Sequence, residues 1–73
     1  MNIQLSQMRQ GESGKIVKIG SSGMEVALLN FGIAIGDTCT LSDIAPLGDP
    51  IAIAINGTKI SMRKKDAANV WVE

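Results

Sequence analysis

The stretch IAIAINGTKISMR, residues 51–63, predicts a β-hairpin and decides the fold class. Asn56-Gly57 favours a two-residue type I′ turn, and apolar residues alternate with small or polar residues on both sides of it. That turn sets three facing pairs: Ile55 with Thr58, Ile53 with Ile60, and Ile51 with Met62. The opposite face then collects Ala52, Ala54, Lys59, Ser61 and Arg63. A slip of one residue would mix the two faces, so the pattern fixes the register.

A first strand is predicted near the N-terminus, at residues 15–20. The segment is rich in β-branched residues and is bounded by glycines, as strands commonly are. Its alternation is imperfect, because Ile16, Val17 and Ile19 cannot all face one way. We therefore expect a bend or a β-bulge within this strand.

Two further strands are predicted around the hairpin. Residues 37–45 form a long strand that places Cys39 and Leu41 on one face. Residues 46–50 contain two prolines and a glycine, which favours a turn before the hairpin. Residues 70–72 form a short last strand after a polar turn.

A helix is predicted between the first two strands. Ser22 and Glu25 have the spacing of a capping box, in which each side chain bonds to the backbone of the other residue. Gly32 is a suitable residue to end the helix. At about 100° per residue, the side that would pack on the core carries Met24, Ala27, Leu28 and Phe31.

These elements predict a mainly β fold, a small closed SH3-like barrel. It would have about five strands, with one short α-helix between the first two strands. Closure would remove the exposed strand edges that endanger small sheets. With 73 residues, the chain has room for a single domain, residues 1–73.

Charge and cysteine content restrict the partners and the location. Seven basic and seven acidic residues give no net charge, whereas binders of nucleic acid or anionic lipid usually carry a basic excess. Cys39 is the only cysteine, which indicates a reducing compartment. No apolar run approaches about 18 residues, and residues 1–10 contain no apolar stretch of the kind found in secretory signals. We expect a soluble cytoplasmic protein that neither binds nucleic acid nor inserts directly into a membrane.

The residues that most enzymes use are scarce. The chain has no histidine, and its glycines do not spell a phosphate-binding loop. Cys39 could be a reactive thiol or a soft metal ligand, but a buried strand residue is favoured. Asp37, Asp43 and Asp49 could bind a hard cation, but their places near turns favour local hydrogen bonds. We expect no catalysis, no cofactor and no stable metal site.

The basic run Arg63-Lys64-Lys65 has two interpretations as well. A solvated face is favoured, because most such runs are solvated and Asp66 lies beside this one. Contact with an acidic partner is the alternative.

The side of the predicted helix that faces away from the core is the sequence feature that indicates a function. Val26 and Leu29 lie there, and Ile33 follows just past the helix end. A helix on a protein surface normally shows charged residues on its outer face. On the outer face of this helix, only Glu25 and Asn30 are polar.

Two interpretations of this apolar stripe stay open. In one, a helical turn within residues 3–10 covers the stripe with Leu5 and Met8. In the other, the stripe is exposed and binds a protein partner, because exposed apolar patches on small soluble proteins usually mark interfaces. The second interpretation gives four candidate partner-binding residues: Val26, Leu29, Asn30 and Ile33.

Several short motifs follow one another along the chain. They are Leu5, Met8 and Gly11; Leu28-Leu29-Asn30-Phe31-Gly32 with Gly36; Ala45-Pro46; Gly48-Asp49-Pro50; Asn56-Gly57; and Met62-Arg63 before the last strand. Their order and spacing resemble the ferrous iron transport protein A family over nearly the whole chain.

The resemblance implies an SH3-like fold and an accessory role in the cytoplasm. The implied partner is ferrous iron transport protein B, a large membrane transporter with a cytoplasmic GTP-binding domain. The chain would bind that transporter at the inner membrane and would support or regulate iron uptake. The resemblance does not imply that this chain itself binds iron.

This chain departs from the family pattern in ways that favour a second interaction. It has Val26 and Ala27 where the family usually has basic residues, and Ile35 where the family often has proline. Its interface is thus expected to be more apolar, which favours self-association. The alternative function is a free-standing, homo-oligomeric SH3-like interaction module related to the C-terminal domain of iron-dependent repressors.

Overall fold

The predicted hairpin is present with the predicted register. β4 (Ile51–Ile55) and β5 (Thr58–Met62) are antiparallel, and Ile53 pairs with Ile60 at their centre. Asn56 and Gly57 have φ angles of 50° and 78°, which a type I′ turn requires at both central residues. The isoleucines of β4 all point into the core and are buried.

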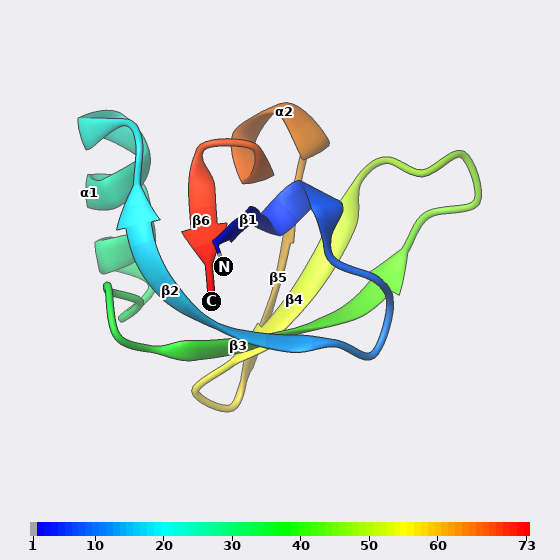
Figure 1. Cartoon of the computed structure of the whole chain (residues 1–73), viewed down its shortest axis with the longest axis horizontal. Helices are drawn as coiled ribbons and strands as arrows, with labels where there is room; N and C mark the ends of the chain where they lie inside the picture. Colours follow the sequence, from blue (N-terminus) through cyan, green and yellow to red (C-terminus); the bar gives the residue numbers. More distant parts are fainter. Residues whose placement is uncertain (1) are drawn as a thin grey trace.

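The computed structural model describes residues 2–73 (Figure 1). The other elements, in chain order, are β1 (Ile3–Gln4), the 3-10 helix η1 (Leu5–Gln7), β2 (Ser13–Ile19), α1 (Ser22–Asn30), β3 (Thr38–Ile44), α2 (Lys64–Ala67) and β6 (Val70–Val72). All six strands form one antiparallel sheet in the order β1-β6-β2-β3-β4-β5. The fold is mainly β with one longer helix between two strands, as predicted.

The sheet curls but does not close, which corrects the expectation of a closed barrel. β1 and β5 lie at the two ends of the strand order and do not pair with each other within residues 2–73. β1 has only two residues, and both of them pair with β6. Within the described residues, β5 therefore has β4 on one side and no strand on the other. This two-residue strand also raises the strand number above the predicted five.

Irregular pairing bends two of the strands. In β2 the register shifts between Ile16 and Lys18, which confirms the expected bulge in the first predicted strand. In β3 a second shift lies between Leu41 and Asp43, at Ser42. The Ser42 hydroxyl donates a hydrogen bond to the carbonyl oxygen of Ala52, at 3.2 Å. Such bulges increase the local twist that curls a small sheet.

The core lies inside the curled sheet. Its buried members are Leu5, Met8, Ile16, Leu28, Ile33, Cys39, Leu41, Ile51, Ile53, Ile55, Ala67, Val70 and Val72. Cys39 and Leu41 share the inner face of β3, as their spacing predicts. η1 packs mainly against α2 and β6, so Leu5 closes one end of the core.

The first and last strands are neighbours. Ile3 pairs with Val72, and Gln4 pairs with Trp71. Figure 1 shows the two ends of the chain close together on the same side of the molecule. The side-chain amide of Gln4 also donates to the carbonyl oxygen of Ala68, at 2.9 Å, which ties β1 to the segment before β6.

Candidate functional site

Helix α1 carries the candidate site and begins one residue earlier than its sequence pattern suggests. The N-cap is Ser21 rather than Ser22, and its hydroxyl oxygen accepts a hydrogen bond from the backbone N–H of Met24, at 3.3 Å. Both serines fit the preference for a small hydroxyl residue at this position. Only the backbone conformation decides between them, and Ser21 has the extended φ and ψ of a cap.

The helix ends in a Schellman motif that turns the chain back toward the core. Gly32, with a φ of 79°, donates from its N–H to the carbonyl oxygen of Leu29, at 2.9 Å. Ile33 donates from its N–H to the carbonyl oxygen of Leu28, at 3.0 Å. This pair of bonds defines the motif, and a contact between its first and last apolar side chains usually accompanies it. Leu28 and Ile33 are accordingly both buried.

This reversal corrects two predictions from the helical pattern. Ile33 was expected on the partner-binding stripe, but it is 1% exposed and belongs to the core. Phe31 was expected in the core, but it is 60% exposed. The helical period does not extend past Asn30, so positions beyond it cannot be assigned to a face by counting 100° steps. Ala27, also expected on the core side, is exposed.

Val26 and Leu29 are exposed, as one of the two sequence interpretations expects. Each side chain is 60% exposed, and Asn30 is exposed beside them, three and four residues apart on the outer side of α1. Leu5 and Met8 do not cover them, because these two side chains are buried in the core near α2 and β6. The interpretation in which the N-terminal turn covers the stripe is therefore wrong.

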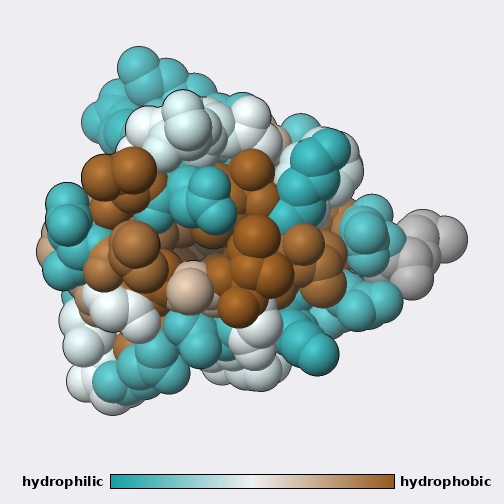
Figure 2. All heavy atoms as spheres, turned by 90° about the vertical axis from the view of Figure 1, so that its left-hand side faces the viewer, coloured by the Kyte–Doolittle hydropathy of each residue, from teal (hydrophilic) through white to brown (hydrophobic). Residues whose placement is uncertain are grey.

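Two exposed apolar residues extend this surface and were missed by the sequence argument. They are Phe31 and Ile35, which follow the helix within the same ten-residue segment. Together with Val26 and Leu29 they make up the α1 patch. Figure 2 looks at the face that carries α1 and shows hydrophobic side chains gathered across it, between polar atoms. Glu25 is the only charged residue of the helix itself.

The hairpin tip holds the turn after α1 in place. The side-chain amide of Asn56 donates to the carbonyl oxygen of Gly32 and to the carboxylate of Asp37, both at 3.3 Å. The Asp37 carboxylate also accepts from the backbone N–H of Ala34, at 2.9 Å. The segment that carries Phe31 and Ile35 is therefore fixed to the sheet.

The aspartates mostly join segments that are far apart in the sequence, so the expectation of local hydrogen bonds holds for the bond between Asp37 and Ala34 but not for Asp49. Asp49 accepts a hydrogen bond from the backbone N–H of Lys64, at 2.9 Å, and its other oxygen lies 3.7 Å from Arg63. These contacts fasten the loop before β4 to the start of α2. Within residues 2–73, no three His, Cys, Asp or Glu side chains come close enough together to hold a metal ion.

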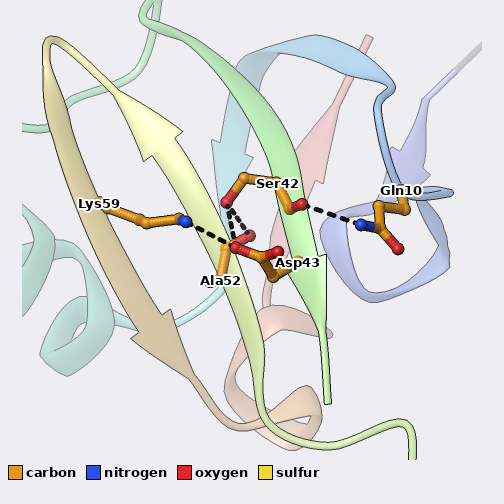
Figure 3. Close-up of polar contacts among 5 residues, drawn as sticks. All are labelled: Gln10, Ser42, Asp43, Ala52 and Lys59. Atoms are coloured by element: carbon orange, nitrogen blue, oxygen red, sulfur yellow. Dashed lines mark hydrogen bonds and ion pairs between the residues drawn. The ribbon is translucent and has the colours of Figure 1, made fainter. Parts of the chain in front are cut away.

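A polar cluster crosses the outer face of the sheet (Figure 3). Lys59 extends from β5 across β4 and pairs with the carboxylate of Asp43 on β3, at 2.6 Å. The hydrogen bond and the positive charge of Lys59 hold the pKa of Asp43 below its ordinary value. The pair borders an open groove of about 430 Å³ whose lining also includes Ile44 and Pro50.

Cys39 is a core residue, as favoured from its place in the strand. Its side chain is completely buried, and burial raises the pKa of its thiol. A thiol in that state is a poor nucleophile at neutral pH, because only the thiolate reacts. Cys39 is therefore not a candidate site, and the α1 patch is the candidate contact surface.

None of the helices in residues 2–73 combines the length and the apolar character that are needed to cross a membrane.

Comparisons with known proteins agree on one family. The model of the FeoA domain matches residues 3–73. A Fe(2+) transport protein A/Fe(2+) transporter FeoB fusion protein of Porphyromonas gingivalis (strain ATCC BAA-308 / W83) is 33% identical over 72 residues. That match covers 97% of this chain but only 8% of the fusion protein.

Two groups of solved structures share the fold. Iron(II) transport protein A from Clostridium thermocellum superposes with a TM-score of 0.90 at 32% identity, over 97% of this chain and 44% of that one. A manganese-dependent transcriptional repressor superposes with a TM-score of 0.86 at 20% identity, over 97% of this chain and 40% of the repressor. The second likeness concerns the fold alone.

Proposed function

Because the chain belongs to the FeoA domain family, we propose that it is an accessory protein that binds a membrane transporter for ferrous iron. It acts by protein–protein contact rather than by catalysis, and it supports or regulates iron uptake. Its place is the cytoplasmic side of the membrane, where the resemblance puts the GTP-binding domain of such a transporter. The α1 patch is the contact surface.

One observation carries this proposal. In the Porphyromonas relative, a segment similar to nearly all of this chain belongs to the same polypeptide as a Fe(2+) transporter FeoB. A covalent link keeps two domains at a high effective concentration, and such links favour pairs that act on each other. A domain that acts on a transporter must contact it through its own surface.

The chemistry of the α1 patch suits that task. Three of its members, Val26, Leu29 and Phe31, are each 60% exposed, and Ile35 is 53% exposed. Exposed apolar side chains that gather on one face usually mark a protein contact. Asn30 adds a polar side chain at the rim, which is the common arrangement in interfaces.

A matched pair of variants tests the proposal. Leu29→Glu places a carboxylate in the patch, where contact with a partner would strip its water. Leu47→Glu makes the same change on the loop before β4, where the leucine is 97% exposed. Both side chains point to solvent, so both variants should melt within a few degrees of the parent protein.

The binding assay uses the transporter, purified in detergent and fixed to a surface. We expect Leu29→Glu to weaken binding by at least about tenfold, because interface hot spots cost 2 kcal/mol or more when they are lost. Leu47→Glu should bind as the parent does. Equal binding by all three proteins would reject the α1 patch as the contact, and loss of binding only with Leu47→Glu would move the contact to the loop.

The alternative is a free-standing, homo-oligomeric interaction module. The likeness in fold to a manganese-dependent transcriptional repressor favours it. This alternative predicts that the parent protein fails to bind the transporter and that Leu29→Glu changes its self-association instead.

A further inference from the structure

The open edge of the sheet is the outer side of β5. In the strand order β1-β6-β2-β3-β4-β5, this strand has β4 on one side and no strand on the other in the described part of the chain. A two-residue type I′ turn makes Ile55 and Thr58 a hydrogen-bonded pair, so Ile60 and Met62 also bond to β4. The backbone N–H and C=O groups of Lys59 and Ser61 therefore point outward.

Those outward groups are arranged so that β5 can pair completely with a copy of itself. Ile60 is the middle residue of the five in the strand. In an antiparallel pair centred on Ile60, Lys59 faces Ser61 of the second copy, and Ser61 faces Lys59 of the second copy. Each of these two pairs exchanges two backbone hydrogen bonds, as residues in a hydrogen-bonded antiparallel pair do. All the outward backbone groups of both strands then have partners.

The side chains of β5 fit the same register. Ile60 would meet Ile60 of the second copy in a non-hydrogen-bonded pair, where facing side chains come closest. Ile60 and Met62 are only half-buried and lie against the core, so a second strand would cover apolar surface that is now at the edge.

The charge on the edge does not oppose this pairing. A lysine on an edge strand usually discourages pairing with another chain. Here the Asp43 carboxylate, at 2.6 Å, neutralises Lys59 and draws it across the sheet (Figure 3). In the self-paired register Lys59 faces a serine rather than its own counterpart, so no two like charges stand opposite each other.

We propose that two copies of this protein join through their β5 strands, antiparallel and about a two-fold axis at Ile60, into one continuous sheet. A pair of five-residue strands buries little surface, so the dimer is weak and depends on protein concentration. The α1 patch is not part of this contact, so the proposal stands independently of transporter binding.

Single cysteines test the register. In a Cys39→Ala background, Ile60→Cys puts two thiols face to face at the axis, within the Cα separation of about 4.4–6.8 Å that a disulfide needs. Met62→Cys is the matched control, because Met62 is also half-buried on the same face. Its own counterpart would lie four residues away along the strand, about 14 Å.

Under mild oxidation we expect Ile60→Cys to form a covalent dimer at least about tenfold faster than Met62→Cys. Equal rates for the two variants would overturn the register.

A second pair of variants tests the hydrogen bonds. Ser61→Pro removes an outward N–H and leaves the bonds to β4 intact, whereas Ser61→Thr keeps the N–H. Sedimentation should show a concentration-dependent dimer for the parent protein and Ser61→Thr, and only monomer for Ser61→Pro.

A parent protein that stays monomeric up to about 1 mM would overturn the proposal, even if its β5 edge paired with a strand of another protein. A dimer that Ser61→Pro does not weaken would overturn it too. A dimer weakened by Leu29→Glu but not by Ser61→Pro would place self-association at the α1 patch instead.

Discussion

Replacement of Ile33 by alanine tests the reversal of the chain after α1. Ile33 is 1% exposed and packs in the core beside Leu28, although it directly follows the exposed helix end. The change removes three carbon groups, each worth about 0.8 kcal/mol when buried, or roughly 2.4 kcal/mol together. The cavity left behind adds to this, and buried isoleucine-to-alanine changes cost about 2–5 kcal/mol.

Leu29→Ala is the matched control for Ile33→Ala. Leu29 is 60% exposed, so its side chain gains little from burial in the monomer. We expect a cost of about 1 kcal/mol or less, partly offset by the better helix propensity of alanine.

Urea unfolding gives the change in the free energy of unfolding for both variants, and thermal unfolding gives the change in melting temperature. Both are followed by circular dichroism. Because 1 kcal/mol corresponds to about 4–8 °C in a domain of this size, Ile33→Ala should lower the melting temperature by about 10 °C or more. A cost below about 1 kcal/mol for Ile33→Ala, or an equal cost for the two variants, would refute the reversal at Gly32 and return Ile33 to the exposed stripe.

Three further predictions concern the hairpin, the ion pair and metal. Ile53→Ala should cost about 2–5 kcal/mol and Lys59→Ala under about 0.5 kcal/mol in urea unfolding, and the reverse order would show a wrong register. Lys59 lowers the pKa of Asp43 in the folded state below its ordinary value of 3.8. The ion pair therefore stabilises the fold fully above pH 3.8, and this stabilisation is lost as the pH falls through the lowered pKa of Asp43. The stability difference between the parent and Asp43→Asn should therefore vanish at low pH, and it should also shrink in high salt at pH 7; a constant difference at every pH would refute this. Ferrous iron should bind weakly and without a defined site in anaerobic calorimetry, and a one-to-one site of micromolar affinity would contradict this.

The hairpin was predictable because a few local residues encode it. Asn56-Gly57 supplies the turn, and the alternation on both sides permits only one register that puts the larger apolar residues of β4 and β5 on the same face. The bulge in β2 was predictable for the same reason, since three neighbouring apolar residues cannot share a face of a regular strand. Period and turn chemistry are properties of short segments, and they need no knowledge of the rest of the fold.

The places of Phe31 and Ile33 depended on the path of the chain beyond the helix. Gly32 was recognised as the residue that ends α1, but the direction of the next residue depends on the bonds that the turn makes. A Schellman motif places its last residue against the helix, so the glycine could have pointed to a buried Ile33. A prediction made in that way would have left Val26 and Leu29 on the exposed side of the helix and assigned Ile33 to the core.

Barrel closure could not be derived from segment patterns. Residues 3–4 are too few to show the alternation of apolar and polar residues that predicts a strand. β1 exists because those residues pair with β6 at the far end of the sequence. Whether β5 then meets another strand depends on the length and curl of the whole sheet. The open edge of β5 is thus a property of the tertiary fold.

The pairing of Ile3 with Val72 gives the domain a single point of attachment. A neighbour fused at either end would leave the surface at nearly the same place, and no linker would have to cross the sheet to reach it. A fused neighbour would therefore lie in nearly the same position relative to α1 whichever end it was attached to. Because the ends are close, the domain also permits circular permutation, in which a short linker joins the original N- and C-termini. The new termini would lie in the loop around Leu47, whose side chain is exposed to solvent.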